Sequence, residues 1–241
     1  MMIIPIQDIN ILHWNGFYKD DNDIKYKLFS ELSLNKIYKP NWLDIIICYT
    51  DRNKALLANQ LELSNISYIN PIVKTNNFIK AYKPIYYYGA LKECKNEYTI
   101  IMDAYDVVII NFNDIIEKLS IYNRQLIYNA QCYDFPPINL EYDVGCPNNT
   151  YNKINSGVVF GKTKDLKEFY KGFSEYTKNN INENEYETLF EQYHLQRYLH
   201  YKLNNISVGI DYKLLSLIQC FNMSLYKDEN NNIFINDENA G

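Results

Sequence analysis

The sequence has no long apolar run, few glycines and no closely spaced cysteine pair. No stretch approaches the roughly 18 apolar residues that a membrane-spanning helix needs, and Met1–Pro5 lacks the basic residues of a signal peptide. Only 8 glycines occur among the 241 residues, and none forms the Gly-rich phosphate loop of P-loop or dinucleotide-binding proteins. We therefore expect no membrane span, and any phosphate chemistry has to use a metal ion and lysine.

The cysteines and the net charge indicate the compartment and the partners to expect. Five cysteines (Cys48, Cys94, Cys132, Cys146 and Cys220) are odd in number, and no two have the Cys-x-x-Cys spacing of a zinc site. This pattern favours free thiols in a reducing compartment, so we expect a cytoplasmic protein. The net charge of −5 argues against nucleic acid or an anionic membrane surface as a partner, because basic surfaces bind both.

What the sequence does contain is an alternation of apolar strands and helices. Strands are expected over Leu43–Tyr49, Ile66–Val73, Tyr98–Met102, Leu126–Ala130, Gly157–Phe160 and Ile206–Ile210. Helices are expected over 24–41, Asn53–Leu63, Lys83–Lys95, Asn113–Leu119, Asp165–Thr177 and Tyr186–Lys202. This order predicts an α/β fold, in a single domain over residues 1–241, with a mostly parallel central sheet flanked by helices. The loop over 131–153 is long enough to carry function.

Two aspartates follow the apolar strand that ends at Met102. Asp103 and Asp106 are three residues apart, and a second apolar run follows them at 107–110. A strand that ends in carboxylates places them at the carboxyl edge of a sheet, where open α/β sheets bind ligands. Two hard oxygen ligands so close together suit Mg²⁺ or Mn²⁺ held partly by substrate phosphates, although Asp is also common in plain turns.

Four segments follow one another in an order that carries a family resemblance. They read MDAYDVV at 102–108, NSGVVFG at 155–161, FEQY at 190–193, and GIDYK at 209–213 leading to IQCFN at 218–222. Together, over residues 43–235, they resemble the glycosyltransferase domain of the multifunctional procollagen lysyl hydroxylases and the bacterial and viral relatives of that domain. The resemblance implies a GT-A fold, a UDP-sugar donor and Mn²⁺ (or Mg²⁺). It therefore implies transfer of a hexose to the hydroxyl group of a glycan, protein or small-molecule acceptor.

The resemblance also implies roles for individual residues on the nucleotide side. Asp103 and Asp106 match the metal-binding aspartates of the family, and Tyr105 between them matches an aromatic residue that stacks on uracil. Thr50 and Asp51, at the end of the first strand, match the region that contacts the nucleoside. The same residue types also occur in plain turns and on packed surfaces.

Further positions are implied for the phosphates and the sugar. A lysine upstream of the aspartates contacts the donor phosphates in the family, and both Lys80 and Lys83 are candidates. The positions that match the sugar site or lie near the reaction are Asn155, Ser156, Gly157, Glu191, Gln192 and Asp211. Glycine permits a close approach of the backbone, and amide and hydroxyl groups bind sugar hydroxyls. At 191 a Glu replaces an Asp of the family; Glu191 and Asp211 are the carboxylates available for catalysis.

The third metal ligand of the family is a His in a His-x-Asn-Gly segment after the last strand. Residues 237–241 contain no such segment, whereas residues 9–16 read INILHWNG, an apolar strand that runs into His13-x-Asn-Gly. We hypothesise that the chain is circularly permuted relative to the family, with residues 1–23 in place of the C-terminal segment and His13 as the third ligand. Alternatively, residues 1–23 end a preceding tandem domain, or His13 is a plain strand-end residue.

Two other classes of protein fit the same residues. A nucleotidyltransferase would also use Asp-held Mg²⁺ on such a sheet, but the Gly-rich basic N-terminal loop that it normally needs is missing. A sugar- or nucleotide-binding module that has lost catalysis would account for the Glu at position 191.

Overall fold

The structure is a computed structural model, and it describes residues 2–14, 24–71, 79–133, 136–137, 140–145, 150–219 and 223–237. The strands are β1 (Met2–Pro5), β2 (Ile11–His13), β3 (Leu43–Cys48), β4 (Tyr98–Asp103), β5 (Val107–Ile109), β6 (Leu126–Gln131), β7 (Lys153–Lys162), β8 (Val208–Ile210), β9 (Leu217–Gln219), β10 (Met223–Lys227) and β11 (Ile233–Asp237). The α-helices are α1 (Ile24–Ser33), α2 (Leu56–Leu63), α3 (Lys83–Leu91), α4 (Ile115–Ser120), α5 (Thr163–Asn180) and α6 (Glu191–His200). Short 3₁₀ helices are η1 (Ile6–Asp8), η2 (Arg52–Lys54), η3 (Lys80–Tyr82) and η4 (Tyr186–Leu189).

The central sheet has five strands in the order β3-β4-β7-β6-β8. β3 and β4 are parallel, β6 and β8 are parallel, and β7 is antiparallel to both of its neighbours. The α/β class is therefore confirmed, while the mostly parallel sheet that we expected is a mixed one. The connection 131–153 leaves β6 and enters β7 at the same edge of the sheet, and without a crossover the next strand must be antiparallel.

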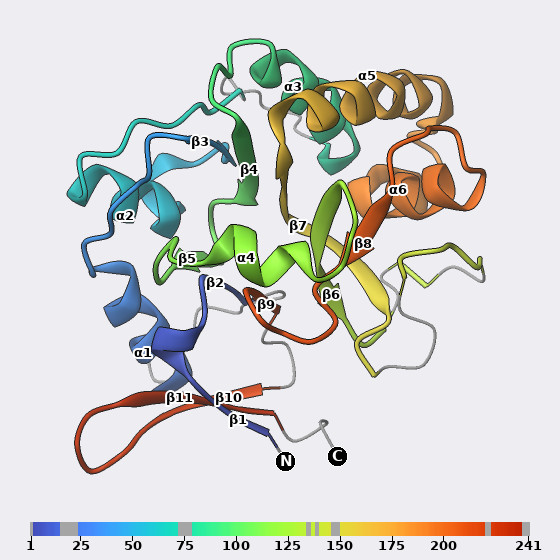
Figure 1. The fold of residues 1–241 in the computed structure, drawn as a ribbon. Coiled ribbons are helices and arrows are strands. Elements are labelled where there is room, and N and C mark those ends of the chain that lie inside the picture. Colours follow the sequence, from blue (N-terminus) through green and yellow to red (C-terminus); the bar gives the residue numbers. More distant parts are fainter. Residues whose placement is uncertain are drawn as a thin grey trace.

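Both faces of this sheet are buried, because successive side chains along each strand point to opposite faces and both sets pack against other elements. On one face, Ile101, Tyr128 and Val159 share a core with α3, α5 and α6, which lie together on one side of the ribbon (Figure 1). On the other face, Met102 and Phe160 share a second core with α2, α4 and the small sheet β5-β2-β9. The candidate site lies at the edge of the sheet where the parallel strands β3 and β4 end.

Two three-stranded sheets join the beginning of the described chain to its end. In the first, β2 is antiparallel to β5 and parallel to β9. In the second, β11 lies between β1 and β10 and is antiparallel to both, so the first and last described strands lie side by side (Figure 1). The hairpin of β10 and β11 was not expected, since the sequence shows only a short apolar segment at Ile233–Ile235.

Several expected elements differ in extent. The strand expected over Ile66–Val73 is reduced to a single bridge between Ile46 and Ile69; Pro71 lacks the next backbone donor, and residues 72 and 73 are outside the described part. The helix expected over 24–41 ends at Ser33. The helix expected over Tyr186–Lys202 divides into η4 and α6, because Phe190 is extended (φ −105°, ψ 130°). Residue 191 is therefore the first residue of a new helix.

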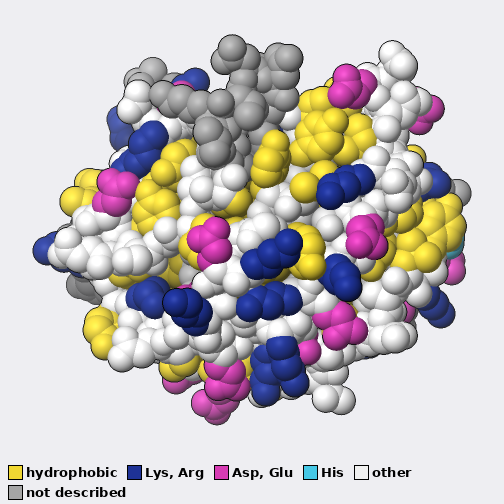
Figure 2. Space-filling model, turned by 90° about the horizontal axis from the view of Figure 1, so that it is seen from above, with side chains coloured by type: hydrophobic (Ala, Val, Ile, Leu, Met, Phe, Trp, Pro, Cys, Tyr) yellow, Lys and Arg dark blue, Asp and Glu magenta, His cyan; other side chains and the backbone are white. Residues whose placement is uncertain are grey.

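The surface is of mixed charge. On the face seen from above, Lys and Arg side chains are interspersed with Asp and Glu (Figure 2). Among the described residues, no helix combines the length and the apolar composition that crossing a membrane would require.

Candidate metal centre

Both predicted aspartates lie where β4 ends and β5 begins. Asp103 is the last residue of β4, and its register partner is Cys48, the last residue of the parallel strand β3. Asp106 directly precedes β5, and its carbonyl oxygen accepts a hydrogen bond from the N–H of Trp14 (2.7 Å). The turn between them is fixed because the carbonyl of the buried Ala104 accepts from the N–H of Leu57 (3.0 Å).

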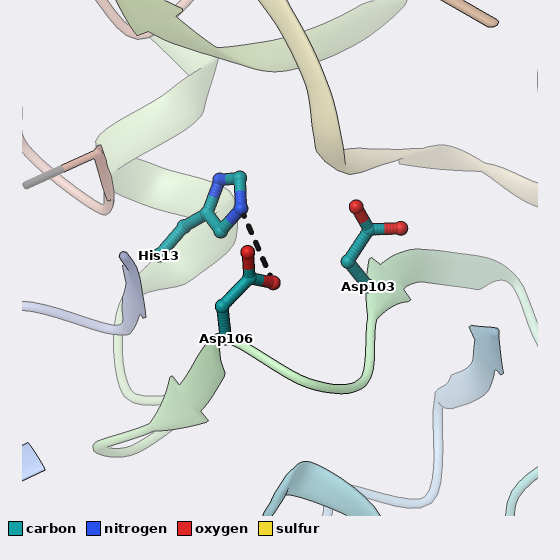
Figure 3. Close-up of side chains that lie close together, drawn as sticks. All are labelled: His13, Asp103 and Asp106. Atoms are coloured by element: carbon teal, nitrogen blue, oxygen red, sulfur yellow. Dashed lines mark ion pairs between the residues drawn. The ribbon is translucent and has the colours of Figure 1, made fainter. Parts of the chain in front are cut away.

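The small sheet brings His13 to the aspartates from the far end of the sequence. His13 ends β2, opposite Val107 of β5. Its Nε2 lies 3.5 Å from Oδ1 of Asp106 and makes no hydrogen bond with any described residue, although the side chain is only 2% exposed. Figure 3 shows the three side chains of His13, Asp103 and Asp106 pointing toward one another. One ligand atom from each lies within 4.8 Å of the others.

This donor set fits a divalent cation. One imidazole nitrogen and two carboxylate oxygens could hold a divalent metal ion, and the open positions would be left to water or substrate oxygens. The buried Nε2 of His13, which has no hydrogen-bond partner in the described part of the chain, is the atom that such an ion would satisfy. Desolvation opposes the charged form of Asp106, but His13 and Lys83 together hold the pKa of its carboxyl below the usual range. The Asp106 carboxyl is therefore held in its anionic form.

Asn129, a residue that the sequence did not single out, sets the orientation of the His13 ring. Its Nδ2 lies 3.0 Å from Nδ1 of His13, and its Oδ1 accepts from the N–H of Val158 (3.2 Å). An amide nitrogen can only donate, so Nδ1 accepts and the ring proton is on Nε2, toward Asp106. If Nε2 held a cation, the ring proton would be on Nδ1, and the Asn129 amide would have to turn its oxygen from the N–H of Val158 to Nδ1–H.

Gly157 leaves the space that the His13 ring occupies. A Cβ at this position would lie 2.2 Å from Cε1 of His13 and 2.8 Å from each ring nitrogen. We expected Asn155-Ser156-Gly157 to line a sugar site through a close approach of backbone and ligand. The structure places this segment inside β7, and the close approach at Gly157 is to His13.

The structure distinguishes the two candidate lysines. Lys83, the first residue of α3, is buried and hydrogen-bonds the Asp103 carboxylate, and its Nζ lies 3.7 Å from Oε2 of Glu191. Burial opposes its charged form, but the neighbouring Asp103, Cys48 and Glu191 raise the pKa of Lys83 above its ordinary value. Lys80 lies instead with its Nζ 5.8 Å from the centre of the Phe190 ring. Of the two lysines, Lys83 is thus the one that contacts a candidate metal ligand, Asp103.

Glu191 and Gln192 are buried, in contrast to a solvated helix face. The side chain of Glu191 is 3% exposed, and neither of its carboxylate oxygens has a hydrogen-bond partner among the described residues. Burial raises the pKa of this carboxyl to about 8; Lys83 opposes the shift and Asp103 adds to it. Glu191 is thus a carboxyl group that exchanges a proton near neutral pH, which suits acid–base work.

We expect Glu191 to make the stability of the protein fall with rising pH. A carboxyl with a folded-state pKa of about 8 against an ordinary 4.5 favours folding most below pH 4.5. That contribution is lost, by up to about 1.4 kcal/mol per pH unit, as the pH rises through the folded-state value. Urea unfolding without divalent ions should show wild type losing stability relative to Glu191→Gln between pH 5.5 and 8.5. A pH-independent difference would contradict the assignment.

Tyr105 joins the aspartate turn to the end of β3. Its hydroxyl oxygen accepts from the backbone N–H groups of Thr50 (2.7 Å) and Asp51 (2.8 Å) and lies 3.0 Å from Oγ1 of Thr50. These three residues were expected on the nucleoside side, and the structure brings them together. Asp51 also caps η2 by accepting from the N–H of Asn53 (3.1 Å).

Two buried glutamines form a polar cluster with β7, and Gln131 was missed in the sequence. Its Oε1 accepts from Nδ2 of Asn155 (2.9 Å), while Oε1 of Gln192 accepts from the N–H of Ser156 (3.3 Å). The Nε2 atoms of Gln131 and Gln192 are buried without a hydrogen-bond partner among the described residues. Such groups are costly unless a ligand or water accepts from them. A Gln at the end of an apolar strand was the available signal for Gln131.

Asp211, one of the two carboxylates that we expected for catalysis, is hydrogen-bonded within the fold. Its carboxylate accepts from the hydroxyl of Tyr122 and from the N–H groups of Leu215 (3.0 Å), Ser216 (2.7 Å) and Leu217 (2.6 Å). These bonds close the turn into β9, the strand that pairs with β2 and so supports His13. Both carboxylate oxygens of Asp211 are thus occupied within the fold.

A scan against protein-family models gave no match, and a search of the curated proteins found no similar sequence. The geometry of the site is therefore the basis on which a function can be inferred.

Proposed function

We propose that this protein is a metal-dependent glycosyltransferase that moves a hexose from a UDP-sugar to an acceptor hydroxyl. The observation that supports it is the group His13, Asp103 and Asp106 at the carboxyl edge of the sheet, with the buried Lys83 beside it. Two carboxylates and an imidazole that leave part of a cation free are suited to an ion shared with a diphosphate.

The residues around His13, Asp103 and Asp106 would have different roles in such a reaction. A bound Mn²⁺ or Mg²⁺ would neutralise charge that develops on the leaving diphosphate. Lys83 would add a second positive charge beside it, while the turn held by Tyr105, Thr50 and Asp51 would receive the nucleoside. The unpartnered amides of Gln131 and Gln192 are donors for sugar hydroxyls.

Glu191 is the best candidate for moving a proton at the acceptor. It lies beside Lys83 and next to Gln192 in the sequence, and its pKa of about 8 lets it exchange protons near neutral pH. The acceptor would approach from the connection 131–153, part of which is outside the described residues. Free thiols at Cys48 and Cys94 support the cytoplasmic setting that belongs to this proposal.

Thermal unfolding with and without ligands tests the proposal. We expect UDP and Mn²⁺ together, at about 100 times their Kd, to raise Tm by about 5–10 °C, and either alone to raise it much less. UDP-glucose, UDP-galactose and their N-acetyl forms should then be screened for hydrolysis. A preference for UTP or CTP over UDP would favour a nucleotidyltransferase. Binding without any turnover would favour a non-catalytic module, and no Tm shift would overturn the proposal.

A further inference from the structure

Lys83 lies between two carboxyl groups and is hydrogen-bonded to only one of them. Its ammonium group hydrogen-bonds Asp103, and its Nζ lies 3.7 Å from Oε2 of Glu191. The side chains of Lys83 and Glu191 are 9% and 3% exposed, so water screens neither group well. Both oxygens of Glu191 lack hydrogen-bond partners among the described residues.

We propose that Lys83 is an internal cation that competes with the divalent ion for Asp103, and that its ammonium group moves to Glu191 when the ion binds. This inference depends on the metal centre of the proposed function. An ion held by Asp103 would face the ammonium group across one carboxylate, and two cations at such a distance repel each other. The ammonium group therefore has to leave Asp103, and the buried carboxyl group of Glu191, with Oε2 3.7 Å from Nζ, can receive it.

The fold permits this movement without a backbone shift. Lys83 begins α3, Asp103 ends β4 and Glu191 begins α6, so each residue is held by a different packed element. A lysine stem has four rotatable carbon–carbon bonds, and rotation about them can carry Nζ across the short gap to Glu191. Burial raises the pKa of Glu191, and an arriving ammonium group would favour its charged form.

Mn²⁺ affinity without nucleotide, measured from the free-ion EPR signal, tests the competition. We expect Lys83→Met to bind Mn²⁺ about tenfold more tightly than wild type. Lys92→Met is the matched control: Lys92 follows α3 on the surface, over the ring of Tyr88, and its loss removes the same charge. The control should bind like wild type. Equal or weaker binding by Lys83→Met would overturn the inference.

Glu191→Gln separates a receiving carboxylate from a general effect of charge. In the wild-type background it should weaken Mn²⁺ binding several-fold, since Lys83 then has no second carboxyl group that can become its partner. In the Lys83→Met background it should have no effect. Equal effects of Glu191→Gln in both backgrounds would show that Glu191 acts on the ion directly, and would overturn the inference.

The ammonium signal of Lys83 in ¹⁵N NMR gives a measurement on the unaltered protein. Titration with Mg²⁺ should shift this signal in step with ion binding, and an unchanged signal at saturation contradicts the movement. Absence of Mn²⁺ binding in every form would remove the metal centre and the inference together. Binding by wild type that Lys83→Met does not strengthen would remove the inference alone.

Discussion

Replacing both Asp103 and Asp106 by Asn is expected to lower the affinity for Mn²⁺ by about a hundredfold or more. Two of the three ligands would lose their charge, and hard cations bind carboxylate oxygens far better than amide oxygens. Because the ion is shared with the diphosphate, the Tm increase on adding UDP with Mn²⁺ should disappear as well. Isothermal titration with Mn²⁺ and thermal unfolding with UDP measure the two effects.

The double variant Asp114→Asn/Glu117→Gln is the matched control. Both residues are exposed on or next to α4, and Asp114 has a left-handed backbone (φ 56°) that Asn also adopts readily. It removes the same two negative charges away from the metal centre and should bind Mn²⁺ like wild type. An equal loss of affinity in both variants would point to unspecific attraction by net charge, and wild-type binding by the Asp103/Asp106 variant would exclude this site.

Asp103 removal also affects Lys83, so the fold of the variant has to be measured separately. A buried cation that loses its partner costs about 3–5 kcal/mol unless another anion replaces that partner. Glu191 lies 3.7 Å from Nζ of Lys83 and is available for this. The single variant Asp106→Asn leaves the Lys83–Asp103 pair in place, and a loss of Mn²⁺ affinity there cannot be attributed to Lys83.

The aspartate group was predictable because its signal is local. An apolar strand that stops at a carboxylate describes Asp103, and the sheet edge follows from the alternation of strands and helices. That Thr50 lies near Asp103 could be predicted in the same way, because β3 and β4 are parallel and end in register at Cys48 and Asp103. The local sequence pattern was enough to predict the position of candidate residues that lie at the end of a strand.

Residues placed by long-range packing were harder to predict. No local signal joins His13 to Asp106; only the family resemblance indicated it, and the pairing of β2 with β5 produces the contact. The pairing of β1 with β11 supplies the proximity that the permutation hypothesis requires, and permutation itself remains a hypothesis. Asn129 and Gln131 look like ordinary polar residues of an edge strand, whereas β6 is buried along its whole length.

The direction of β7 could not be predicted, because the sequence shows how long the connection 131–153 is but not which edge of the sheet it leads to. A loop of that size can cross a sheet or return at the same edge. It returns, and β7 therefore begins beside the carboxyl ends of β4 and β6. This reversal is what brings Gly157 to His13 instead of to the start of a strand at the opposite edge.

Gly157→Ala is expected to disable the metal centre by a purely steric route. A Cβ 2.2 Å from Cε1 of His13 is closer than any real contact, so either the ring turns away from Asp106 or β7 shifts. We expect Mn²⁺ affinity to fall by at least about tenfold, as for other losses of ligand positioning. The crowding should lower the free energy of unfolding by about 1–3 kcal/mol. Urea unfolding and Mn²⁺ titration of the same sample measure both effects.

Two further variants separate crowding from other effects of the added methyl group. Gly89→Ala, within α3, is the control, since a Cβ there meets nothing within 4 Å; it should stabilise the helix by about 0.5–1 kcal/mol and leave Mn²⁺ binding unchanged. Adding His13→Ala to Gly157→Ala removes the clash, so stability should recover while Mn²⁺ affinity stays low. If the double variant stays as unstable as Gly157→Ala alone, the ring of His13 is not what Gly157 accommodates.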